Sequence, residues 1–157
     1  MIAEIKLTEK GLQAQSERRL NHTVEDVWAM LTDNNLLKKW FQELQVGDLQ
    51  EGGFMKFDMS DDVYEKLEIT ELETLSVLEF DWFGDEVRFE LHSKQDDCLL
   101  IFQEKVNTIT EQTKKDLAGW HVCLDVIKAL LDGKPIQREQ EWKKWHEKYV
   151  QALNELI

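Results

Sequence analysis

The chain has 157 residues, of which 32 are acidic and 19 basic, giving a formal net charge of −13. Nucleic acids and anionic lipid surfaces bind basic patches, so this balance argues against both as partners. Hydrophobic residues make up 42% of the chain and include six Trp and seven Phe, enough for a packed interior rather than a disordered chain. We expect a single domain over residues 1–157.

The sequence shows no feature typical of export or membrane insertion. No run approaches the roughly 20 apolar residues that span a bilayer. The N-terminal MIAEIKLTEKG lacks the apolar core of a signal peptide. Cys98 and Cys123 lie on different expected elements without metal-ligand spacing, which favours two free buried thiols in a reducing compartment. These features predict a cytoplasmic protein.

One strand and two short helices are expected first. Leu12 to His22 carries the pattern of a half-exposed strand. Thr23 is a typical N-cap, and Asp26 follows at the position of a capping-box carboxylate. A second short helix is expected from Asn34 or Asn35 through Trp40 and Phe41.

From Leu44 onward the apolar period changes to two, which indicates strands. Turn signals occur at Gly52-Gly53, Asp61-Asp62, Gly84-Asp85 and Gln95–Asp97. The expected strands run through 44–49, 54–57, 64–72, 75–83, 87–91 and 100–106. Short strands joined by short turns predict an antiparallel meander.

A long amphipathic helix is expected from Thr110, as N-cap, to Gly133, after which Pro135 cannot continue the helix. Its apolar stripe consists of Leu117, Trp120, Leu124, Ile127 and Leu131, widened by Cys123, Val126 and Leu130. A final helix over 137–157 presents Trp142, Trp145, Tyr149 and Leu153 on one face. That face packs either on its own domain, which we favour, or on another subunit.

This order predicts an α+β helix-grip fold, in which a curved antiparallel sheet wraps around the long helix. The stripe would face a concave surface lined by Phe80, Trp82, Phe89 and Phe102. The domain core would run from about residue 12 to residue 134, with the last helix added to it.

Two segments also resemble a known family. ERRLNHTVEDVWAMLTDNNLLKKWF is similar to the opening signature of the START-like, or SRPBCC, superfamily, in which a strand leads into two helices ending in Trp-Phe. KKDLAGWHVCLDVIKALLDGK resembles the long helix of the branch related to the activator of the heat-shock-protein-90 ATPase. The resemblance covers Ser16 to Lys134. It implies a cavity between the long helix and the sheet.

Physical reasoning limits what that cavity can be. A dry void of roughly 300 Å³ would cost about 7 kcal/mol, close to the stability of a whole domain. The interior is therefore filled by side chains, wet or occupied by a ligand. The residues expected to line a binding cavity are Trp40, Phe54, Phe57, Trp82, Phe89, Phe102, Trp120 and Leu124.

Catalytic and metal sites have little support in the sequence. His22, His92, His121 and His146 are dispersed, and only His121, beside Trp120, could edge the pocket. There is no metal-binding or phosphate-loop motif, so no cofactor is expected. Arg88 and Lys66 lie inside apolar strands; we expect them to face solvent, although an inward one could meet a ligand carboxylate.

Two functions from different classes remain. The leading hypothesis is non-enzymatic binding of a hydrophobic or amphipathic small molecule, lipid- or polyketide-like, between the long helix and the sheet. The alternative is a protein-interaction or co-chaperone-like module. It would use the acidic surface and a protein partner or homodimer contact through Trp142, Trp145 and Tyr149. An enzyme would need an inward-facing acid or base that the sequence does not single out.

Overall fold

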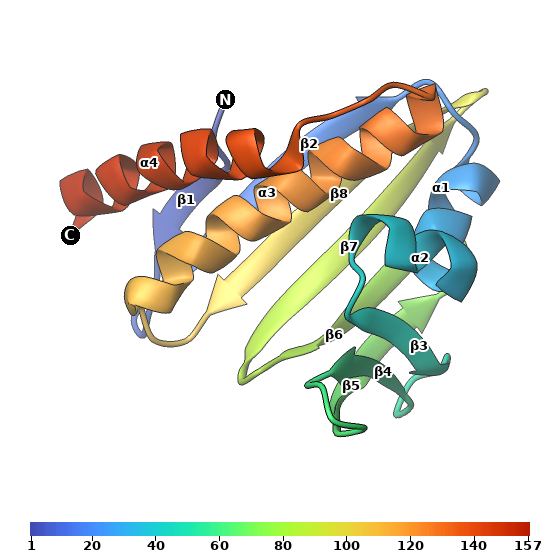
Figure 1. Ribbon diagram of the computed structural model, residues 1–157, viewed down its shortest axis with the longest axis horizontal. Coiled ribbons are helices and arrows are strands. Elements are labelled where there is room, and N and C mark those ends of the chain that lie inside the picture. Colours follow the sequence, from blue (N-terminus) through green and yellow to red (C-terminus); the bar gives the residue numbers. More distant parts are fainter.

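An eight-stranded antiparallel sheet is crossed on one face by a long helix (Figure 1). The computed structural model describes residues 1–157. The strands are β1 (Glu4–Leu7), β2 (Leu12–Leu20), β3 (Leu44–Asp48), β4 (Phe54–Asp58), β5 (Tyr64–Glu73), β6 (Val77–Trp82), β7 (Asp85–Lys94) and β8 (Asp97–Val106). The helices are α1 (Val24–Thr32), α2 (Asn34–Trp40), α3 (Glu111–Asp132) and α4 (Arg138–Leu156). This arrangement confirms the predicted helix-grip fold.

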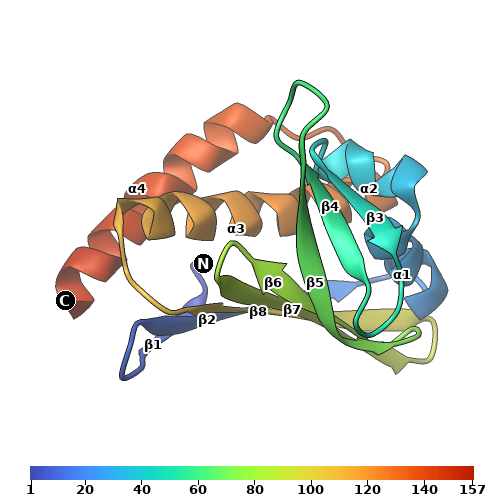
Figure 2. The same ribbon diagram turned by 90° about the horizontal axis from the view of Figure 1, so that it is seen from below.

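The sheet follows the chain as a meander with one long return. Its order is β1-β2-β8-β7-β6-β5-β4-β3, and every neighbouring pair is antiparallel. Irregular pairing between Ile69 and Glu71 in β5 marks the place where the sheet bends. Figure 2 shows β3, β4 and the adjoining part of β5 turning toward the side that the helices occupy. The bend gives the sheet the concave face that receives α3.

The ends of α3 form where the sequence predicts them. The Thr110 hydroxyl accepts a hydrogen bond from the backbone N–H of Gln112, and the Thr113 hydroxyl accepts one from the N–H of Thr110, so a capping box closes the start. Gly133 adopts a left-handed backbone with φ 67°, which costs a glycine little and ends the helix. Thr23 caps α1 as expected, and α2 begins at Asn34 as expected, with Asp33 as its N-cap.

A first strand, β1, was not predicted. Glu4 to Leu7 pairs with Leu12 to Gln15 of β2 and forms one edge of the sheet. Most of its side chains are exposed, so it lacks the buried alternation that identifies the central strands. This strand is defined by its hydrogen-bonded pairing with β2 and not by an alternation of apolar residues in its own sequence.

The last helix packs on its own chain. Figure 1 shows α4 lying against α3, and Trp145, Tyr149 and Leu153 are buried there. The backbone N–H of Ala3, at the other end of the chain, donates to the Tyr149 hydroxyl at 2.9 Å. The expectation of a partner or homodimer contact through Trp142, Trp145 and Tyr149 therefore needs correcting. Trp145 and Tyr149 are enclosed, and only the half-buried Trp142 reaches the surface.

Candidate ligand-binding cleft

Aromatic side chains fill the concave face of the sheet. Trp120 of α3 lies at their centre, with ring centroids 4.9 Å from Trp82 and 5.1 Å from Phe102. Trp40 of α2 closes the far side and donates its indole N–H to the Met30 carbonyl at 2.7 Å. A cavity between Trp120 and Phe102 in the interior has a volume of only about 10 Å³. Side chains therefore occupy most of the space that the resemblance implies to be a cavity.

Most of the residues expected to line a cavity lie close together, but they form part of the packed hydrophobic core instead of the wall of a cavity. Trp40, Phe89 and Leu124 are fully buried. Phe102 adjoins the small internal cavity, and Trp120 adjoins that cavity and one further pocket. Phe57 lies half-buried beside Phe41 and Trp82. Of the expected set, Trp82 and Trp120 are the ones that reach an open cleft.

Phe54 lies apart from the others. It shares a strand face with the exposed Glu68, its register partner, and its ring lies beneath the Lys66 ammonium at 4.6 Å. Its neighbour Met55 is the residue of this pair that is fully buried. Because successive strand residues point to opposite faces, Phe54 is on the outer surface of the sheet. The run Glu51–Phe54, EGGF, has no apolar alternation from which this register could be predicted.

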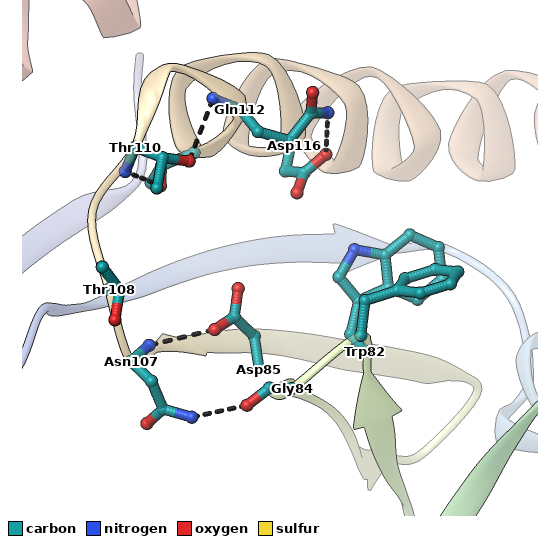
Figure 3. Close-up of a pocket in the computed structure, with 10 residues that line it drawn as sticks. Trp82, Gly84, Asp85, Asn107, Thr108, Thr110, Gln112 and Asp116 are labelled. Atoms are coloured by element: carbon teal, nitrogen blue, oxygen red, sulfur yellow. Dashed lines mark hydrogen bonds between the residues drawn. The ribbon is translucent and has the colours of Figure 1, made fainter.

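A cleft of about 330 Å³ opens at the N-terminal end of α3. One wall is the β6–β7 turn with Trp82, Phe83 and Asp85; the other is the first two turns of α3 with Gln112 and Asp116 (Figure 3). Hollows of similar volume along β1 and β2 have no aromatic side chain in their walls. The cleft by α3 thus combines an aromatic surface with converging polar groups, as binding sites for small molecules do.

A second pocket continues from this cleft toward α4. It has a volume of about 140 Å³ and shares Trp82 and Asp116 with the first. Its remaining walls are mostly apolar and include Phe41, Trp120 and Trp142. Trp82, which is 7% exposed, therefore stands between a polar cleft and an apolar one.

Two carboxylates dominate the electrostatics of the cleft. Asp85 accepts a hydrogen bond from the backbone N–H of Asn107 at 3.0 Å, and Asp116 accepts one from the side chain of Gln112 at 2.9 Å. Burial raises the pKa of Asp116, and the charge of Asp85 adds to this, while hydrogen bonds from Gln112 and Trp82 oppose it. No Lys or Arg lines this cleft. Its negative charge is therefore not compensated locally.

One inward-facing acid of the sheet, Glu104, was not predicted from the sequence. Glu104 of β8 is 0% exposed, and neither of its carboxyl oxygens has a hydrogen-bond partner. Burial raises its pKa well above the usual value, and the charges of Asp116 and Asp85 raise it further. Glu104 continues the alternation of Leu100, Phe102 and Val106, so the strand period was the signal that identifies it.

His121 belongs to the packing of α4 rather than to the cleft. Its Nδ1 lies 2.8 Å from the Tyr149 hydroxyl, and its ring lies on Trp145 with centroids 3.9 Å apart. Because the Ala3 N–H already donates to the Tyr149 oxygen, the phenol proton is free to be donated to Nδ1. Burial lowers the pKa of His121 to about 3, with the charge of Arg18 the next cause. The imidazole is therefore neutral at physiological pH.

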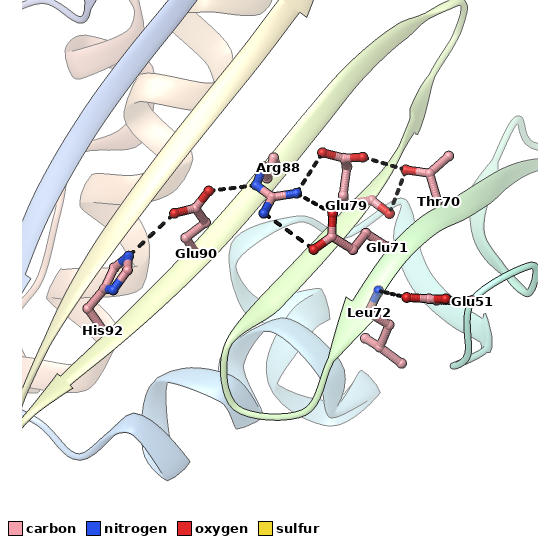
Figure 4. Close-up of polar contacts among 8 residues, drawn as sticks. All are labelled: Glu51, Thr70, Glu71, Leu72, Glu79, Arg88, Glu90 and His92. Atoms are coloured by element: carbon pink, nitrogen blue, oxygen red, sulfur yellow. Dashed lines mark hydrogen bonds and ion pairs between the residues drawn. The ribbon is translucent and has the colours of Figure 1, made fainter.

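The outward orientation expected for Arg88 and Lys66 is confirmed. Arg88 lies on the convex face, where its guanidinium donates to Glu71, Glu79 and Glu90 (Figure 4). Lys66 is exposed above Phe54. Neither side chain can meet a ligand between the helix and the sheet.

Cys98 and Cys123 are both buried and free, as predicted. No grouping of three or more His, Cys, Asp or Glu side chains is arranged to hold a metal ion. Each helix is too short or too polar to cross a membrane.

A curved antiparallel sheet that grips one long helix defines the START-like, or SRPBCC, class of proteins. Within it, residues 21–132 match the family described as Activator of Hsp90 ATPase homolog 1-like protein, and the chain belongs to that family. Comparison with curated proteins gives no match.

Solved structures share the fold, two of them over nearly the whole chain. A conserved protein of unknown function from Enterococcus faecalis, EF2215, is 25% identical with a TM-score of 0.89, covering 99% of this chain and 92% of that one. CalU16 from Micromonospora echinospora is 23% identical with a TM-score of 0.69, covering 93% and 92%. The Aha1 dimer from Colwellia psychrerythraea is 20% identical with a TM-score of 0.63, covering 76% and 95%.

Proposed function

We propose that the protein binds an amphipathic small molecule in the cleft between the β6–β7 turn and the start of α3. The observation that carries this proposal is the position of Trp82, which lines both the polar cleft and the apolar pocket behind it. The cleft volume of about 330 Å³ is in the range that small-molecule sites occupy, roughly 300–1,000 Å³, and the adjoining pocket adds about 140 Å³. These features support a binding site at one end of the helix–sheet interface.

The packed interior supports this placement. A ligand lying along the whole length of α3 would have to displace Trp40, Phe89 and Trp120, which contact one another. Separating a buried aromatic cluster forfeits both apolar burial and ring–ring contacts. A ligand in the cleft needs movement of few side chains, because the space is already open.

The arrangement supports binding without chemistry. The buried acid and base of the interior, Glu104 and His121, adjoin a cavity of about 10 Å³, which accommodates one water molecule and no organic substrate. In the cleft itself, the titratable side chains are the two carboxylates of Asp85 and Asp116. No nucleophile with an adjacent base faces the open space.

The alternative, a module that recruits a protein partner, has a narrower basis in this chain. Its family is described as Activator of Hsp90 ATPase homolog 1-like protein, and one solved structure of the same fold is described as a dimer. The aromatic face of α4 that would have carried the contact is packed on α3. A partner would have to use other surfaces.

Native mass spectrometry of freshly purified protein tests the proposal, with two matched variants. Phe83 is 49% exposed at the rim of the cleft, so Phe83→Ala should reduce the fraction of protein carrying a co-purified ligand without unfolding the domain. Tyr64→Ala removes an equally exposed aromatic from the outer face of the sheet and should leave that fraction unchanged. A bound mass that Phe83→Ala leaves intact would place the ligand elsewhere.

A further inference from the structure

Resting on the proposed function, we further propose that the cleft selects an organic cation: an ammonium group carried on an apolar body. The ammonium would lie between the carboxylates of Asp85 and Asp116 and the indole of Trp82. The apolar body would extend past Trp82 into the second pocket.

The polar groups of the cleft are arranged for a positive charge. Asp85 and Asp116 stand on opposite walls, and Figure 3 shows both side chains directed into the space that Trp82 borders. Each is hydrogen-bonded through one oxygen, Oδ1, to a neighbouring amide N–H. A carboxylate has two oxygens and several lone pairs, so both retain acceptor capacity for a ligand. An aromatic face beside them adds cation–π attraction.

An anion is disfavoured in the same place. The N-terminus of a helix commonly attracts anions through free backbone N–H groups. Here the capping box uses those of Thr110, Gln112 and Thr113, which donate to threonine oxygen atoms. Two basic residues, Lys115 and Arg138, line the second pocket but not the cleft, and Arg138 donates to the Cys123 sulfur.

The unpartnered carboxyl of Glu104, inside the protein, is subject to the same negative electrostatic potential as the cleft. It is fully buried beneath α3, and no basic group is among the causes of its pKa shift. The charges of Asp116 and Asp85 act on it through the low-dielectric interior. A cation in the cleft would offset this concentration of negative charge, whereas an anion would add to it.

The second pocket, behind Trp82, is more apolar than the cleft. Phe41, Trp120 and Val122 form apolar walls there, and Trp142 covers the side nearest α4. A ligand with its ammonium between the carboxylates would therefore place its hydrocarbon or aromatic part against these side chains. Burial of that part supplies affinity, and the charge supplies selectivity.

Three probes with hydrocarbon chains of similar length test the inference: octyltrimethylammonium, octanoate and octyl glucoside, each below its micelle-forming concentration. Titration followed by two-dimensional ¹H–¹⁵N NMR gives the dissociation constant and the amides that shift. We expect octyltrimethylammonium to bind about tenfold more tightly than octanoate, with shifts at the side-chain amides of Asn107 and Gln112.

Charge-neutral variants separate the cleft from the overall negative charge. Asp85→Asn and Asp116→Asn should each reduce the preference for the cation, and the double variant should abolish it. Asp61→Asn removes one charge from the exposed β4–β5 turn and should retain the full preference. A preference that survives the double variant, or that falls equally in Asp61→Asn, would overturn the inference.

The outcomes also distinguish this inference from the proposed function. Equal affinity for all three probes, with shifts at the cleft amides, would reject the cation and retain the binding site. Absence of shifts at the cleft with every probe would reject both.

Discussion

Trp82 of β6 and Trp120 of α3 meet across the helix–sheet interface with ring centroids 4.9 Å apart and ring planes at 68°. This edge-to-face contact separates the filled interior from the open cleft. Trp120 is on the inner side, in contact with Phe89 and Phe102. Trp82 is on the outer side, where it lines both pockets. The two residues should therefore respond differently to truncation.

Trp120→Ala should be strongly destabilising. Removing a buried Trp leaves a cavity and forfeits apolar burial, so the free energy of unfolding should fall by about 3–5 kcal/mol. Trp82→Ala should cost less, because part of its surroundings is already open, and should join the two pockets. Urea denaturation measures both losses. An equal loss in the two variants would contradict the division between interior and cleft.

Glu104 should make stability depend on pH. Its folded-state pKa is raised above the ordinary value of 4.5, so the native state holds a proton that the unfolded state releases. Stability is then fully present below about pH 4.5 and decreases as pH rises toward the folded pKa, by about 1.4 kcal/mol per pH unit from this group. Urea denaturation between pH 4.5 and 8 measures this slope.

Glu104→Gln should remove that contribution, because glutamine does not ionise. Glu17→Gln, on the exposed side of β2, is the matched control and should retain the wild-type dependence. Identical pH profiles for Glu104→Gln and wild type would show that the carboxyl has found a partner that keeps it charged.

His121 should remain neutral in mildly acidic solution. Its pKa of about 3 in the folded protein lies below the ordinary value of 6.5, so between these pH values the unfolded state binds a proton that the native state does not bind. Stability from this group is lost as pH falls from about 6.5 toward 3. The Tyr149 hydroxyl donates to Nδ1, which places the imidazole proton on Nε2, 3.6 Å from Asp125.

Nitrogen-15 NMR of the imidazole identifies its protonation state and tautomer directly. We expect the neutral Nε2–H form at pH 5, and loss of the fixed tautomer in Tyr149→Phe. That variant leaves the Ala3 N–H and Nδ1 without their partner, which should cost about 1–3 kcal/mol of stability. A doubly protonated His121 at pH 5 would refute this arrangement.

Much of the fold could be predicted from the sequence because local signals agree with the tertiary structure. Thr110 and Gly133 mark the ends of α3 through backbone groups that any helix must satisfy. Leu78, Phe80 and Trp82 alternate because one face of β6 is buried. By contrast, β1 has mostly exposed side chains and is identified only by its pairing with β2. The outward side of Phe54 follows from an irregular register between β3 and β4.

The site was harder to predict for a related reason. Aromatic residues mark a core and a ligand wall with the same pattern, so Trp40 and Trp82 could not be distinguished before their neighbours were known. The polar members of the cleft, Asp85 and Asp116, are ordinary turn and helix residues in sequence. The α3 position of Asp116, one turn before Trp120, was a usable signal, because residues four apart share a helix face.

The Arg88 cluster on the convex face should contribute to stability in a salt-dependent manner. Arg88→Met would leave the carboxylates of Glu71, Glu79 and Glu90 without their shared cation, at a cost of about 1–2 kcal/mol. Arg88→Lys should be intermediate, because lysine keeps the charge and loses the planar fork. Thermal denaturation at low and high salt checks this, since screening should reduce the difference. A stability unchanged in Arg88→Met would show that solvent already screens the cluster.

Deleting residues 137–157 distinguishes an integral helix from a partner-binding one. The deletion removes the buried side chains of Trp145, Tyr149 and Leu153 and exposes His121 on α3. Each large apolar side chain is worth a few kcal/mol, so the sum approaches the whole stability of a domain, about 5–15 kcal/mol. We expect the truncated chain to lose its cooperative thermal transition, measured by circular dichroism. Deleting only the exposed Leu156 and Ile157 should leave the transition in place. A truncated chain that melts like wild type and changes only its oligomeric state would instead identify α4 as the surface for a partner.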